Sequence, residues 1–217
     1  DVSRKLSILS TLAYGGVVRD EDVKKRGLAD IRAIDIEMAG DMGYNVKYLG
    51  HSKLIDKDKV YTTVEPVLFP KESMMSNVNS EFNIISIAGD IIGELQFYGK
   101  GAGKDATANA VVGDALYIIN CMKEGTYPSY LPMDKPLQKL GNSVFEGRYY
   151  LRANLKKEED LEFIMKIMDQ VNGRSHIIIS DKTIFFNTGE VHADIFDDMV
   201  TEIKKKVPDL FYARIYE

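Results

Sequence analysis

The hydrophobic positions at the start of the chain repeat with the period of amphipathic helices. Residues 1–14 show such a repeat, which stops at the pair Gly15–Gly16. A second helix is predicted over 30–42, where the apolar residues at helical spacing are Ile31, Ile34, Met38 and Met42. Gly43 follows this segment, and glycine commonly ends a helix because it adopts positive φ without steric cost. The chain is therefore expected to begin with two helices.

After residue 45 the pattern changes from helical to strand-like. Four segments rich in β-branched and aromatic residues follow, at 46–55, 60–69, 83–88 and 91–98. Turn-forming residues separate these segments, so several of the connections are short. Short links favour antiparallel pairing, because parallel strands need a long crossover connection. We therefore expect a mostly antiparallel sheet with helices packed on it.

In the last third of the chain, strand and helix patterns alternate. The predicted strands are 148–155, 175–180, 183–187 and 210–216, and the predicted helices are 158–171 and 193–207. This βαββαβ order is the ferredoxin-like plan, with two helices on one face of a four-stranded sheet. The expected fold class is α+β, a mostly antiparallel sheet followed by a small ferredoxin-like domain. We expect a first domain at 1–125, a linker at 126–145 and the small domain at 146–217.

Composition and charge exclude several classes of function. The 217 residues carry 28 Lys plus Arg and 33 Asp plus Glu, a net charge of −5, which argues against a nucleic-acid partner. The longest apolar runs are far shorter than the roughly 20 residues that span a membrane, so no membrane partner is expected. The single cysteine excludes a disulfide framework, and the three scattered histidines suggest no metal site. A cytoplasmic location is the default expectation.

The first predicted helix begins with a charged pair. Asp1 and Lys5 are four residues apart and therefore lie on one helical face, beside an apolar stripe. One interpretation is an exposed ion pair that contributes a few tenths of a kcal/mol. The other is a lysine whose stem is buried and whose ammonium lies in a cleft, where it is suited to proton transfer. Because Asp1 stands already inside this helix, we expect the chain to be the C-terminal part of a longer protein.

A glycine-rich stretch joins the fourth predicted strand to a long helix over 107–122. Three glycines, Gly99, Gly101 and Gly103, permit close backbone approach, and the helix start offers free N–H groups to an anion or an amide. The spacing does not match the dinucleotide-binding fingerprint, because Lys104 occupies the position of the last glycine. A turn without any ligand is an equal alternative.

Taken together, these segments resemble homoserine dehydrogenase. The stretches that carry the resemblance lie in the family's order, and they are Asp1–Leu9, Asp35–Ala39, Gly43–Gly50, Val64–Pro70, Phe97–Gly103 and Thr107–Asp114. Their order and number cover most of residues 1–122, and the glycine loop followed by Thr-Ala-x-Ala-Val-Val-x-Asp is the most specific of them. The resemblance implies an enzyme that reversibly oxidises L-homoserine to aspartate semialdehyde with NAD or NADP, in the route to threonine and methionine.

The resemblance also implies roles for individual residues. Lys5 would be the general acid/base at the substrate hydroxyl, and Asp1 would bind L-homoserine. Gly101, Ala102 and Gly103, together with Thr107, would contact the cofactor. The family's nucleotide-binding domain, which binds most of the NAD or NADP, should precede residue 1, so the chain alone is expected to be inactive. A homodimer formed through the sheet of the first domain is expected.

Residues 146–217 resemble an ACT domain, a small module that senses an end-product amino acid in some members of the family. The turn at 154–159 lacks the glycine that is usual in amino-acid-binding members. Such a segment either binds an amino-acid effector or serves dimerisation alone, and we favour dimerisation. A different class of function also fits the pattern, namely a non-catalytic, dimeric regulator that senses amino acids.

Overall fold

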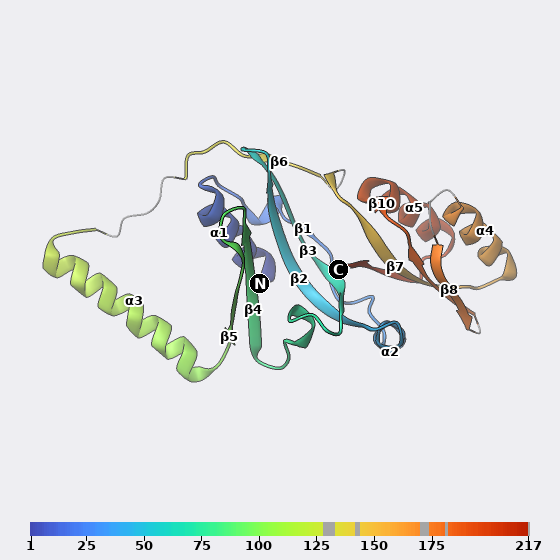
Figure 1. Ribbon diagram of the computed structural model, residues 1–217, viewed down its shortest axis with the longest axis horizontal. Coiled ribbons are helices and arrows are strands. Elements are labelled where there is room, and N and C mark those ends of the chain that lie inside the picture. Colours follow the sequence, from blue (N-terminus) through green and yellow to red (C-terminus); the bar gives the residue numbers. More distant parts are fainter. Residues whose placement is uncertain (128–132, 142–143, 170–173, 181, 217) are drawn as a thin grey trace. The chain divides into compact units, whose positions relative to one another are not determined.

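The computed structural model describes residues 1–127, 133–141, 144–169, 174–180 and 182–216, and it divides into two compact units. The first unit is formed by Asp1–Lys71 with Pro132–Glu217, and the second by Glu72–Leu131. Figure 1 shows the course of the chain, which leaves the first unit after Lys71, forms the second unit and then returns to the first. Parts of the expected linker at 126–145, and the last two residues of the helix expected at 158–171, lie outside the described residues.

The first unit contains four of the five α-helices of the described chain. They are α1 (Val2–Tyr14), α2 (Ala33–Asp41), α4 (Glu158–Met168) and α5 (Ala193–Lys206), with a short 3-10 turn at Asp20–Asp22. Its strands are β1 (Lys24–Lys25), β2 (Tyr44–Ile55), β3 (Lys59–Pro70), β6 (Gln138–Lys139), β7 (Glu146–Asn154), β8 (Arg174–Ser180), β9 (Thr183–Thr188), β10 (Val191–His192) and β11 (Leu210–Ile215). Each helix and strand expected from the pattern at 1–69 and 148–216 is present, with shifted ends.

Strand β3 organises one nine-stranded sheet. The main strand order is β1-β3-β11-β7-β9-β8; β2 and β6 also pair with β3, and β10 pairs with β7. β2 and β3 form a long antiparallel hairpin, with register from Tyr44 opposite Pro70 to Ile55 opposite Lys59. On its other edge β3 pairs in parallel with β6, β1 and β11 in turn. The sheet therefore joins the start of the chain directly to its end.

The C-terminal part of this sheet has the ferredoxin-like arrangement. Its elements follow in the order β7, α4, β8, β9, α5 and β11, and the strands lie in the order β11-β7-β9-β8, all antiparallel. The apolar faces of α4 and α5 pack on it, centred on Ile164, Phe196 and Ile203, each fully buried. The βαββαβ order predicted from the pattern is thus confirmed.

The opposite face of the sheet is covered by α2. Tyr150, Phe211 and Ala213 belong to a second buried cluster with Ala39 of α2, whereas Tyr149 belongs to the α4–α5 core. Neighbouring residues of a strand point to opposite faces, which explains how one strand supplies both cores. The sheet in this region is thus buried on both sides.

The second unit consists of the hairpin of β4 (Phe82–Gly89) and β5 (Gly93–Lys100) followed by α3 (Lys104–Glu124). The four strands expected between residues 46 and 98 are all present, but they are divided between two sheets, because among the described residues β4 pairs with β5 alone. Both edges of β3 are already occupied, by β2 on one side and by β6, β1 and β11 on the other. The parallel pairings of β3 were not foreseen.

Candidate functional site

The charged pair at the start of α1 is exposed. Lys5 Nζ lies 2.7 Å from Asp1 Oδ2, and the two side chains are 61% and 78% exposed. The amide of Lys5 donates to the carbonyl of Asp1, so the pair stands on the first helical turn. The structure agrees with the first interpretation, an exposed ion pair, and a buried lysine stem is not seen in this chain.

The face of α1 that packs on the sheet is polar, contrary to the expectation of an apolar inner stripe. Ser7, Ser10 and Thr11 are buried, and Ser10 Oγ donates to Ser52 Oγ of β2 over 2.8 Å. Thr11 Oγ1 accepts the amide of Val18, which fixes the segment that follows the helix. Hydroxyl side chains therefore satisfy one another and the backbone at this contact, while Val2 and Leu6 supply an apolar part of it beside Gly50 of β2.

The apolar positions of α1 lie instead on its exposed side. Ile8 is 60% exposed and Leu12 is 46% exposed, and both continue the line of Asp1 and Lys5 along the helix. An apolar patch beside a charged pair is a surface that favours contact with another part of a protein. We call Asp1, Lys5, Ile8 and Leu12 the α1 face.

The glycine-rich entrance of α3 is shaped by its backbone. The amide of Gly101 donates to the carbonyl of Glu81, and a Cβ at position 101 would lie 1.6 Å from Nδ2 of Asn83. Gly103 is the N-cap of α3 and has φ +133°, a region that residues with a side chain rarely adopt. At two of the three glycines, Gly101 and Gly103, a side chain would therefore be sterically unfavourable.

The start of α3 presents backbone rather than side-chain groups. The N-cap residue, Gly103, has no side chain that could accept a hydrogen bond from the first amides of α3. The neighbouring residues Ala102 and Thr107 are exposed. The amide of Thr107 donates to the carbonyl of Gly103 as the first helical hydrogen bond. The helix start can therefore offer N–H groups to a ligand, although Asp105 in the first turn places a negative charge nearby.

The candidate residues are distributed over both units. Asp1 and Lys5 belong to the first unit, whereas Gly101, Ala102, Gly103 and Thr107 belong to the second. In the part of the chain that the structure describes, no three His, Cys, Asp or Glu side chains are grouped so that they could hold a metal ion. None of the helices among the described residues is long and apolar enough to cross a membrane.

A charge cluster that no sequence pattern indicated joins β3, β11 and the residue after β1. Glu65 Oε2 is 3.1 Å from Arg26 Nη2, and Glu65 Oε1 is 3.4 Å from Arg214 Nη2. Arg214 also donates to Tyr61 Oη over 3.1 Å, and Arg26 lies over the ring of Tyr212. In the sequence Glu65 and Arg214 are single charges in strands and Arg26 ends a run of three cations, so no local pattern distinguishes them from solvent-facing positions.

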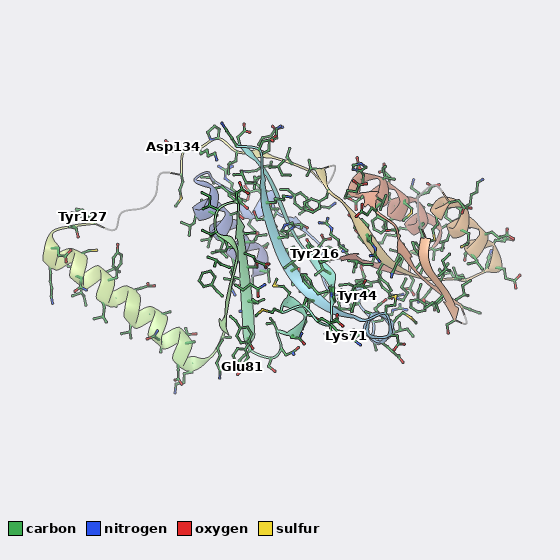
Figure 2. All side chains as sticks on the ribbon, in the orientation of Figure 1. Tyr44, Lys71, Glu81, Tyr127, Asp134 and Tyr216 are labelled. Carbon is green, nitrogen blue, oxygen red and sulfur yellow. The ribbon has the colours of Figure 1, made fainter. Side chains whose placement is uncertain are left out.

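His51 of β2 lies beside this cluster in an aromatic environment. Its Nδ1 is 3.1 Å from the hydroxyl of Tyr216, the residue after β11 (Figure 2), and its ring meets that of Phe145 edge-on with centroids 5.4 Å apart. Burial, followed by repulsion from Arg214 and Lys53, lowers the pKa of His51 to about 4. The residue is therefore neutral at physiological pH.

In the turn between β7 and α4, backbone amides donate hydrogen bonds to the side-chain carboxylate of Asp160. The amides of Lys156 and Lys157 donate to Asp160 Oδ2 over 2.9 and 3.0 Å. These hydrogen bonds, that from Lys156 first, lower the pKa of Asp160. Two of the amides that could receive a ligand's carboxylate at this turn are therefore occupied.

Fold and site together define an α+β protein with an acid–amine pair at one helix start and a glycine-rich entrance at another. Residues 1–116 match the sequence model of the homoserine dehydrogenase family. The chain belongs to the homoserine dehydrogenase family. This confirms the family that the sequence motifs indicated.

Individual relatives agree with the family. The homoserine dehydrogenase of Bacillus subtilis is 32% identical over 86% of this chain and 41% of its own length. That of Lactococcus lactis is 36% identical over 82% of this chain and 45% of its own length. The chain thus spans less than half the length of these curated relatives.

Solved structures show the same fold. A homoserine dehydrogenase from Thiobacillus denitrificans matches 99% of this chain and 52% of its own with a TM-score of 0.82 at 23% identity. A homoserine dehydrogenase from S. aureus matches the same shares with a TM-score of 0.69 at 25% identity. The agreement over 99% of the chain includes the ferredoxin-like region beyond residue 116.

Proposed function

We propose that the chain is the C-terminal part of a longer homoserine dehydrogenase, which interconverts L-homoserine and L-aspartate 4-semialdehyde with NAD or NADP. The observation that carries this proposal is the Asp1–Lys5 pair on the exposed α1 face, within the segment that matches the family. A nucleotide-binding domain that precedes residue 1 would cover this face and complete the site. The chain without that domain is then inactive.

Lys5 is the proposed general acid/base. Its Nζ lies 2.7 Å from Asp1 Oδ2, so the two groups are partners while no substrate is present. When the α-ammonium group of homoserine binds to Asp1, it replaces Lys5 as the partner of that carboxylate. Lys5, which is exposed, would then lose one proton to bulk water, and the neutral amine would accept the proton of the substrate hydroxyl while the hydride of the carbinol carbon leaves to the bound cofactor. In the reverse direction it returns a proton to the aldehyde oxygen.

The entrance of α3 fits one end of a nicotinamide cofactor. The backbone at Gly101 and Gly103 carries no side chain that could block approach, and the helix start has N–H groups for an amide or a phosphate. Ala102 and Thr107 flank these groups on the exposed side of the turn. When bound, the cofactor supplies the hydride acceptor of the oxidation.

The proposed context is that of a dimeric, cytoplasmic enzyme of threonine and methionine biosynthesis. Residues 1–125 bind substrate and dimerise, 126–145 link the two parts, and 146–217 are ACT-like. We propose that the ACT-like segment serves assembly rather than effector binding, because Asp160 occupies two amides of its first strand-to-helix turn. Calorimetric titration of threonine and methionine tests this, and heat of binding from either one contradicts it. A measurement of the molecular mass in solution tests the proposed homodimer.

Replacement of Lys5 by alanine, in the chain joined to its nucleotide-binding domain, tests the enzymatic proposal. We expect kcat for homoserine oxidation to fall about 10²- to 10⁴-fold, the usual contribution of a general acid/base. Arg4→Ala is the matched control, since it removes an exposed cation from the same helical turn and should leave kcat within about twofold. Retained homoserine oxidation in Lys5→Ala would remove the acid/base assignment.

A further inference from the structure

A buried carboxylate ties α2 to the ferredoxin-like strands. Asp35 is 0% exposed, and its Oδ1 accepts hydrogen bonds from Tyr150 Oη over 2.9 Å and from Arg152 Nε over 2.8 Å. Its Oδ2 accepts the amide of Arg32 over 2.8 Å, at the N-terminus of α2. One side chain therefore fixes the start of a helix in the family-matched region and two side chains of β7, which lies outside it.

The cluster extends to the turn before β11. Asp209 lies 3.4 Å from Arg152 Nη1, 2.8 Å from Arg32 Nη2 and 2.7 Å from Asn154 Nδ2. Arg152 Nη2 also donates to the carbonyl of Asp30 over 3.1 Å. The buried guanidinium of β7 thus joins two carboxylates and a backbone carbonyl from two separated segments, the start of α2 and the turn before β11.

From Asp35 a short path of packed elements leads to α1. Helix α2 continues through Gly43 into β2, and β2 supports α1 through the hydrogen bond from Ser10 to Ser52. At Gly50 of β2 the two elements are so close that an added Cβ would lie 3.3 Å from Val2 of α1. These contacts form a continuous route from α2 to the helix that carries Asp1 and Lys5.

A role in stability alone is a weak account of this cluster. A buried ion pair costs much of its Coulomb attraction in desolvation, and apolar residues of similar volume often give equal stability. Elsewhere this part of the sheet is packed with apolar side chains, including Ala39, Phe211 and Ala213 in the same cluster of buried residues. An ion pair differs from such packing in its directionality, since it fixes one relative position of the two segments.

We propose that the buried Asp35–Arg152 pair is a conformational link, through which the state of the ferredoxin-like segment sets the position of the α1 face. Asp35 and Arg152 are positioning residues and touch no reacting group. The link itself is independent of chemistry, but its consequence for catalysis rests on the proposed function of Lys5. The coupling is reciprocal, so perturbation from either side must reach the other.

Backbone amide exchange on the whole chain tests the link without reference to activity. Asp35→Asn keeps the shape of the side chain and removes its charge, and Arg152→Lys keeps the charge and loses the planar fork. For both variants we expect exchange in α1 and β2 to accelerate about tenfold, with little change in α4 and α5. Tyr150→Phe removes one hydrogen bond and should give the same pattern at about fivefold.

The matched control is Asp197→Asn, since Asp197 and Lys24 also join the two parts of the sheet, at 2.7 Å, but on the surface. Its exchange pattern should equal that of the unmodified chain. Two outcomes would overturn the link, namely unchanged exchange in α1 while α2 loosens, or an equal acceleration in every element. If the link holds but Lys5→Ala retains activity, the proposed chemistry fails and the coupling stands.

Discussion

The histidine of β2 gives the most direct test of the structure in solution. His51 is enclosed by Phe145, Tyr216 and the buried cluster around Arg214, and burial is the main reason that its pKa falls to about 4. In the unfolded chain the pKa returns to about 6.5. The native state therefore binds fewer protons than the unfolded state whenever the pH lies between these two values.

The sign and size of the effect follow from this difference. Above pH 6.5 the residue is neutral in both states and costs no stability. As the pH falls, the unfolded chain takes up the proton first, so the free energy of unfolding decreases until the native pKa is passed. At about pH 5 the loss from His51 is about 2 kcal/mol, and below pH 4 it levels off at about 3 kcal/mol.

The assay is urea unfolding of the unmodified chain and of His51→Gln, which cannot titrate, at about pH 7.5 and pH 5. Other groups also titrate in this range, but they do so in both proteins and cancel in the difference. We expect the stability of the unmodified chain relative to His51→Gln to fall by about 2 kcal/mol between the two pH values. His192→Gln, at an exposed histidine, is the control. A difference that does not change with pH would show that His51 is not enclosed as described.

Two further predictions concern packing and backbone. Phe196 is fully buried and stacks on Tyr149 with ring centroids 3.9 Å apart. Phe196→Ala should therefore lower the free energy of unfolding by about 3–5 kcal/mol and the melting temperature by about 10 °C. The control is Ile195→Ala, at a residue that is 50% exposed, which should change the melting temperature by less than about 3 °C. A shift for Phe196→Ala as small as that of the control would contradict the α5 packing. Gly103→Ala places a side chain on a residue with φ +133°, and this strain should accelerate amide exchange in the first turns of α3 about tenfold. The control is Gly99→Ala, where an added Cβ meets nothing within 4 Å, and this variant should leave the exchange in α3 unchanged. Equal exchange in both variants would refute the strain argument.

Much of the secondary structure followed from local patterns. The helices α4 and α5 have one apolar face each, and the strands around them are short runs rich in β-branched and aromatic residues, so the βαββαβ order could be predicted without any tertiary information. The motifs around Lys5 and the glycine loop also sufficed for the family, which the match over residues 1–116 confirmed. The roles of Asp1, Lys5 and the loop residues remain predictions.

The orientation of α1 was not predictable in the same way. Its Ile8 and Leu12 suggested an inward stripe, yet its serine and threonine face packs on β2. A helical repeat states only which residues share a face, and the surroundings decide which face is covered. The hydroxyl groups of Ser10 and Ser52 meet because β2 presents a serine there, a fact that becomes visible only once the two elements are adjacent.

Local sequence patterns were sufficient for the long helices and strands, their order and the family, because these depend on residues close together in the chain, whereas the two-residue strands β1, β6 and β10 carry no such pattern. The tertiary structure alone decided that β3 pairs with β11, so that one sheet unites the two ends of the chain. It alone decided which charges are buried, since Asp35 meets Arg152 across more than a hundred residues and no local pattern records a partner at that distance. Local periodicity encodes the conformation of a segment, whereas pairing and burial depend on which distant segments share the same space.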